Sequence, residues 1–247
     1  MKSSVARATS IYCMSLCCTL AATAQAEQGP LPTASVATGA ALGSEHQPMT
    51  RSAAKVLREI GRIESRLTRT RYQHRTVVRP WAGVFLWDCS GMADWIIRRV
   101  APRARRAIHR KRPVARDFHR LIARSPTDRA RRGWRRVARV TDARPGDVFT
   151  WLRPSHWPKG ISGHVGFVMS SPKALPGRPG AYAVRIADAT SIPHENDSRN
   201  YDEGGGFGTG TILFKVDDDG RGTHYGWHGS RGDWTAETEI LIGRLYP

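Results

Sequence analysis

The sequence predicts an α+β fold in which N-terminal helices pack on an antiparallel sheet. Two amphipathic helical patterns come first, and after about residue 142 the chain turns to segments rich in β-branched and aromatic residues. Glycine and proline clusters separate these segments, as is typical of strands joined by turns. With 247 residues, 40% of them hydrophobic, the chain can bury a core, so disorder throughout is excluded.

Residues 1–26 have the three parts of a secretory signal peptide. The start is basic, a short apolar run follows, and an Ala-Gln-Ala sequence ends the segment. A buried N-terminal helix is the alternative. We expect an exported protein, periplasmic or extracellular, with no transmembrane anchor once the signal is removed. Residues 27–50, rich in small residues, Gly and Pro, predict a flexible linker, and residues 51–247 predict a single catalytic domain.

The first helix is expected over residues 52–67 and the second over residues 88–100. Apolar residues recur in both at steps of three and four, and Pro102 marks the end of the second helix.

Five strands are expected to follow in the segments DVFTWL, HVGFVMS, YAVRIADAT, TILFKVD and EILIGRLY. The glycine-rich residues 204–210 lack the lysine and the following helix of a phosphate loop. They predict a flexible turn before the fourth strand.

Residues 98–144 carry most of the positive charge. They hold 17 arginines and one lysine against three aspartates, a net charge of +15, whereas the whole chain has +18. An apolar helical stripe from Val114 to Ile122 predicts a folded helical insertion with arginines on its outer face. A solvated helix face, docking to an anionic polymer and nucleic-acid binding are the alternatives. Only Phe118 and Trp134 could stack on bases, so no nucleic acid is expected.

The sequence Trp-Asp-Cys-Ser-Gly at residues 87–91 opens the second helix. Cys89 is the one cysteine outside the signal segment. The positive end of the helix dipole and the free N–H groups there favour a thiolate and can receive an oxyanion. Asp88 is expected to cap the helix. The alternative for Cys89 is a small buried hydrophobic side chain.

Two further residues complete a candidate nucleophile, base and orienter. His164 opens the strand HVGFV, and Asp188 lies on the next strand, where it would fix the imidazole tautomer. Asp188 could instead pair with an arginine, and His194 is a rival orienter or a loop histidine. The remaining histidines fit no zinc pattern, so no metal and no cofactor are expected.

These motifs resemble the NlpC-type cell-wall cysteine peptidases, a family of the papain-like superfamily that also contains the CHAP amidases. The sequence DCSG opening a helix, then PGD, then HVG on a strand carries the resemblance, which spans residues 72–190. It implies a papain-like NlpC-type α+β fold and metal-free amide hydrolysis, usually of peptidoglycan peptide stems. It assigns Cys89 as nucleophile and His164 as base. Asp188 stands where the family has its third polar residue, and Tyr72 matches a tyrosine near the thiolate or oxyanion.

We therefore expect an exported cysteine hydrolase that acts on peptidoglycan by a Cys-His-Asp mechanism, with an acyltransferase as a variant of the same chemistry. The competing hypothesis is a catalytically idle protein that docks to an anionic cell-envelope polymer through residues 98–144. Peptidoglycan or another anionic envelope polymer is the expected partner in both. Neither hypothesis assigns a role to residues 191–247.

Overall fold

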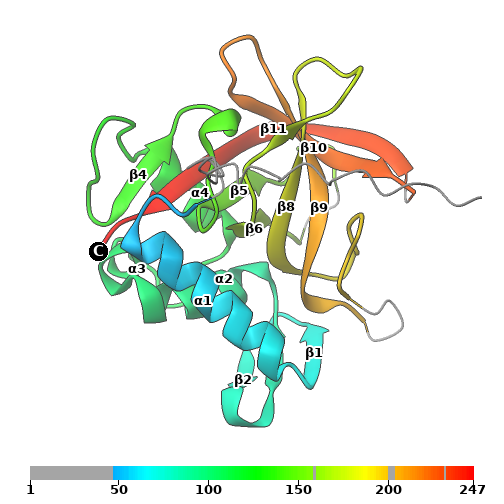
Figure 1. Ribbon diagram of the computed structural model, residues 1–247. Helices are drawn as coiled ribbons and strands as arrows, with labels where there is room; N and C mark the ends of the chain where they lie inside the picture. The colour runs from blue at the N-terminus through cyan, green and yellow to red at the C-terminus, as the bar shows by residue number, and fades with distance from the viewer. Residues whose placement is uncertain (1–46, 158–159, 200–203, 231) are drawn as a thin grey trace, which may run out of the picture. The chain divides into compact units, whose positions relative to one another are not determined.

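The computed structural model describes residues 47–157, 160–199, 204–230 and 232–247 (Figure 1). The expected signal peptide and most of the expected linker lie outside the described residues. The described chain is mostly β-structure, with four α-helices and a closed six-stranded antiparallel barrel. The predicted papain-like NlpC-type α+β fold, with N-terminal helices packed on an antiparallel sheet, is therefore wrong.

The helices are α1 (Arg51–Arg66), α2 (Cys89–Val100), α3 (Pro102–Arg106) and α4 (Ala115–Ala123). A small sheet contains β1 (Arg69–Tyr72), β3 (Val84–Trp87) and β2 (Val77–Arg79). The barrel strands are β5 (Val148–Leu152), β6 (Gly163–Val168), β8 (Ala181–Thr190), β9 (Gly206–Val216), β10 (Gly222–Gly229) and β11 (Gly232–Leu245). Two short strands pair with the barrel: β4 (Trp134–Val137) with β11, and β7 (Lys173–Ala174) with β8.

Strand β10 closes the barrel because it pairs with both β9 and β11. Sequence reasoning missed β10, since Gly222–Gly229 is rich in glycine and histidine and poor in β-branched residues. It also took residues 204–210 as a turn, whereas Gly206–Gly210 lie within β9 and pair with β8. Strand β11 is longer than its apolar segment suggested and pairs with β10, β5 and β4 in turn. Without β10 the sheet has an open edge, which is why the sequence suggested a different fold class.

The alternation of side chains along each barrel strand builds two cores. Phe149, Ile186 and Phe214 belong to one core together with Tyr225 and other barrel residues. Side chains of the opposite parity, such as Phe167, pack with the apolar residues of the helices. Helix α2 packs on β6 and β8. The barrel thus holds the beginning of α2 near two of its strands.

Both expected helices form, and each begins at a side-chain cap. Thr50 accepts a hydrogen bond from the Ala53 N–H at 3.0 Å, and Asp88 accepts one from the Gly91 N–H at 2.7 Å. Such caps satisfy N–H groups that have no intrahelical partner. Across the described residues, no helix combines the length and the apolar character that a membrane span requires.

The arginine-rich residues 98–144 include the end of α2, both α3 and α4, and β4. The segment is therefore only partly helical, and β4 joins it to the barrel sheet. Arg105 is buried, pairs with Asp94 and donates to the carbonyl groups of Ile108 and Arg110. Most of the other arginines are exposed.

Candidate active site

Cys89 is the first residue of α2, separated from β3 only by Asp88, and it is a free and buried cysteine. The carboxylate of Asp88 accepts hydrogen bonds from the Gly91 N–H at 2.7 Å and from the Ser90 hydroxyl at 2.9 Å. By their position in the first turn, the N–H groups of Cys89 and Ser90 have no carbonyl one turn earlier to which they could donate. They can therefore stabilise the oxyanion that forms on a carbonyl oxygen when the sulfur attacks the carbonyl carbon.

His164 is the second residue of β6, and its Nε2 lies 2.7 Å from Oδ2 of Asp188. The ring packs against Trp151, with centroids 4.8 Å apart. Because Asp188 occupies Nε2, Nδ1 is the ring nitrogen left for Cys89. Burial acts to lower the pKa of His164, but the Cys89 charge, hydrogen bonds to Asp188 and Cys89, and the Asp188 charge raise it to about 10. The imidazole therefore holds its proton beside the sulfur.

Asp188 lies in β8 and is completely buried. Its Oδ2 accepts a hydrogen bond from His164 and another from Nε2 of His194, at 2.8 Å, and its Oδ1 accepts one from Arg199. Burial would raise the pKa of this carboxyl, but the charges of Arg199 and His194 and the two histidine hydrogen bonds hold it well below its usual range. Asp188 is therefore a carboxylate that can stabilise an imidazolium at His164.

Asp188 and His194 were the rival orienters of His164 in the sequence, and in the structure His164 and His194 both bind the same carboxylate oxygen of Asp188. His194 fixes Asp188, and Asp188 contacts His164. Arg199 completes the cluster: it pairs with Asp197 and donates to the carbonyl groups of Gly206 and Gly208 at 2.8 and 3.0 Å. Sequence reasoning did not identify Arg199. The sequence feature that pointed to such a residue was Asp188 itself, because an aspartate in an apolar strand requires a polar partner.

Tyr72, at the end of β1, lines the same cavity as Cys89. Burial and the charges of Cys89, Asp88 and Asp188 all raise the pKa of its hydroxyl, which therefore stays protonated and can donate a hydrogen bond. Sequence reasoning missed His74, whose ring packs edge-on against Tyr72 and whose Nδ1 lies 3.2 Å from Oδ2 of Asp88.

Two adjoining cavities form a cleft at this cluster. One cavity, of about 510 Å³, includes His164 and is lined by aromatic side chains, namely Trp151, Trp157, Tyr225, Trp227 and Trp234. The other, of about 360 Å³, includes Cys89 and is lined by polar and basic residues, among them Asp88, Ser90, Arg110 and Arg116. Tyr72, His74, Ile161 and Gly163 line both. A substrate can therefore reach the thiol and the imidazole from one continuous cleft.

No protein-family model, curated protein or solved structure matches this chain. The chemistry of the site therefore has to follow from its own geometry. In the described part of the chain, no three His, Cys, Asp or Glu side chains are grouped so that they could hold a metal ion. The residues that the cleft brings together are suited to nucleophilic catalysis by a thiol.

Gly208→Ala is expected to destabilise the folded chain by about 1–3 kcal/mol, because a Cβ added there would lie 2.5 Å from Cγ of the buried Arg199. Arg199 cannot move away without losing its bonds to Asp188. Gly61→Ala on the exposed face of α1 meets nothing within 4 Å and should instead stabilise by about 0.5–1 kcal/mol. Urea unfolding of both variants checks this, and equal effects at the two positions would contradict the close packing of Arg199.

Proposed function

We propose that this protein is a cysteine hydrolase that cleaves an amide bond with Cys89 as nucleophile, His164 as proton carrier and Asp188 as the residue that orients His164. The observation that carries the proposal is the linked placement of these three side chains. Nε2 of His164 lies 2.7 Å from a fully buried carboxylate, and the pKa of His164 responds to Cys89 through charge and a hydrogen bond.

In the proposed reaction, the sulfur of Cys89 attacks the carbonyl carbon of the amide, and the oxygen becomes an oxyanion held by the N–H groups of Cys89 and Ser90. His164 gives its proton to the leaving nitrogen, the C–N bond breaks and a thioester forms. His164 then takes a proton from water, which attacks the thioester, and the acid and the thiolate of Cys89 are released beside the protonated His164. An amine or alcohol in place of water would make the same site an acyltransferase.

The proposed substrate is the peptide stem of peptidoglycan, outside the cytoplasm. The resemblance of residues 72–190 to NlpC-type cell-wall peptidases supports the substrate, and the signal-like residues 1–26 support the location. The net charge of +18 favours encounter with an anionic envelope polymer. The aromatic cavity beside His164 offers stacking surfaces to the part of the substrate that flanks the scissile bond.

Soluble muropeptides incubated with the chain are expected to yield two products whose summed mass exceeds the substrate by one water, as mass spectrometry can measure. Cys89→Ala should reduce the rate by about a thousandfold or more, because nothing replaces the nucleophile. Arg58→Gln, on the exposed side of α1, should leave the rate unchanged. Equal rates for the chain and Cys89→Ala would overturn the proposal, and binding of intact peptidoglycan without products would favour the idle binding protein.

A further inference from the structure

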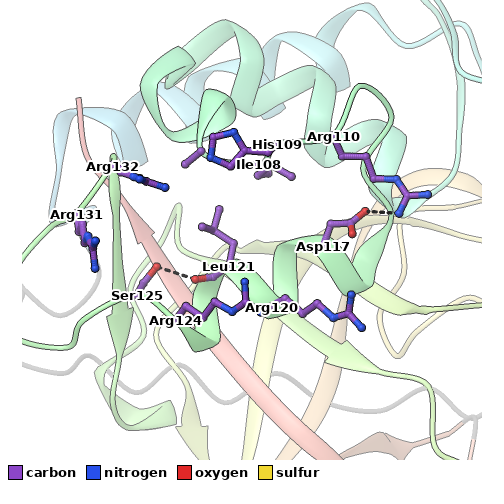
Figure 2. Close-up of a pocket in the computed structure, with 11 residues that line it drawn as sticks. Ile108, His109, Arg110, Asp117, Arg120, Leu121, Arg124, Ser125, Arg131 and Arg132 are labelled. Carbon is purple, nitrogen blue, oxygen red and sulfur yellow. Dashed lines mark hydrogen bonds and ion pairs between the residues drawn. The ribbon is translucent and has the colours of Figure 1, made fainter.

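Five arginines line a separate cavity of about 500 Å³ beside α4. Figure 2 shows this cavity, which is lined by the loop after α3, by helix α4 with its C-cap and by the turn before β4. We call it the arginine pocket. Its arginines are Arg110, Arg120, Arg124, Arg131 and Arg132. Its one carboxylate, Asp117, lies 3.5 Å from Arg110 and also accepts the Val114 N–H. Among the described residues, the other four arginines have no ion-pair partner. The pocket therefore carries a large uncompensated positive charge.

The position of Arg132 has a cost in backbone strain. Arg131 and Trp134 exchange hydrogen bonds across a tight turn, and the two residues between them both have positive φ, 53° at Arg132 and 83° at Gly133. Turns of this kind favour asparagine or glycine, because a longer side chain is strained there. Arg132 is exposed, so burial does not compensate the strain. Strained residues of this sort gather at binding sites, and in Figure 2 the side chain of Arg132 points toward the pocket.

The lining defines the chemistry of the ligand. Guanidinium groups bind phosphate through paired N–H donors, and each retains its charge at any relevant pH. The volume lies in the range of small-molecule sites. No Phe, Tyr or Trp lines the pocket, so it offers no stacking surface for a nucleobase. We propose that the arginine pocket binds an anion that carries two or more phosphate groups.

The arginine pocket lies beside the proposed active site but does not depend on it. Arg110 lines both the arginine pocket and the cavity that contains Cys89, whereas Cys89 itself is not part of the pocket. A ligand seated among the arginines would thus lie next to the cleft. Its binding can be measured whether or not the chain hydrolyses any amide.

Isothermal titration calorimetry of the chain with tripolyphosphate tests the site directly. We expect saturable binding that weakens as salt is added, because the attraction is between exposed charges. Arg120→Gln together with Arg124→Gln should weaken binding by about tenfold or more, since two charge-assisted contacts are lost. Arg51→Gln together with Arg58→Gln removes the same charge from exposed positions of α1 and should change the affinity by less than about twofold. An absence of binding, or equal losses in the two double variants, would overturn the proposal.

A second variant separates binding from folding. Arg132→Gly removes the charge and also relieves the strained φ, so the thermal midpoint should stay the same or rise while tripolyphosphate binding weakens. If binding stays at the level of the unsubstituted chain, Arg132 does not serve the pocket and the proposal fails at this residue.

Vesicles distinguish a lipid headgroup from a free phosphate compound as the source of the phosphate. We compare vesicles of phosphatidylcholine alone with vesicles that also contain a lipid with a diphosphate headgroup. Binding to the second kind that tripolyphosphate displaces, and that the Arg120 and Arg124 double variant loses, supports a headgroup. Binding of tripolyphosphate without binding of vesicles supports a soluble ligand, and binding of neither overturns the proposal.

Discussion

Iodoacetamide is expected to label Cys89 rapidly, and His164→Ala is expected to slow that labelling. The thiolate is the reactive form of cysteine, and an adjacent imidazolium favours it. His164 keeps its proton because its pKa is raised to about 10. Cys89 is the one cysteine beyond residue 26, so intact mass spectrometry of a chain without residues 1–26 reports this thiol alone.

The pH dependence of the same reaction gives a further check. Because the pKa of His164 is raised to about 10, its imidazolium form persists as the pH rises and is lost as the pH passes through about 10. Hydrolysis is therefore expected to fall above that pH, because His164 can no longer donate a proton to the leaving nitrogen. If labelling of the unsubstituted chain matches labelling of His164→Ala at every pH, Cys89 is an ordinary buried thiol and the proposed mechanism fails.

Asp188→Asn is expected to lower the free energy of unfolding by about 3–5 kcal/mol, because it leaves the buried Arg199 with one carboxylate instead of two. It also removes the charge that faces the imidazolium of His164, so both labelling of Cys89 and hydrolysis should slow. The pKa of Asp188 lies well below its usual range in the folded chain. The contribution of Asp188 to the free energy of unfolding is therefore present above about pH 4 and is lost as the pH falls toward the folded pKa. The stability of Asp188→Asn should accordingly fall less on acidification than that of the unsubstituted chain.

Asp147→Asn is the matched control for this variant. Asp147 is equally buried and pairs with Arg244 at 2.7 Å but, unlike Asp188, has no histidine partner among the described residues. Asp147→Asn should destabilise the fold and leave the labelling rate of Cys89 unchanged in the folded protein. Guanidinium unfolding and labelling kinetics separate the two effects. A slowed labelling in Asp147→Asn that equals the slowing in Asp188→Asn would mean that loss of stability, rather than loss of orientation, explains both.

The positions of those site residues that depend on short-range sequence patterns could be predicted. Cys89 stands at the beginning of a helix because Asp88 caps that helix, and the periodicity of the helix is local. His164 and Asp188 lie on strands β6 and β8, which are separated in the chain only by the short β7 and its loops and are neighbours in the sheet, and the register of the two strands follows from apolar alternation.

The closure of the barrel and the deep part of the site could not be predicted, because both depend on contacts that no local pattern encodes. Strand β10 forms because β9 and β11 supply partners on both sides, although its own composition favours turns. Gly208 and Gly210 read as turn residues, whereas in the barrel they make room for Arg199 and His194, which lie against the sheet. A glycine-rich strand signals such a close approach only when its neighbour is known.

The position of β11 in the chain has a consequence for the order in which the candidate site assembles. This strand comes after every other described strand, yet it joins β10 to β5 and so closes the ring that supports β6 and β8. Contacts between segments so far apart in sequence form late and slowly during folding. A growing chain therefore carries Cys89 before His164 and Asp188 are held beside it, and under the proposed function the thiol would gain its reactivity only after β11 has docked.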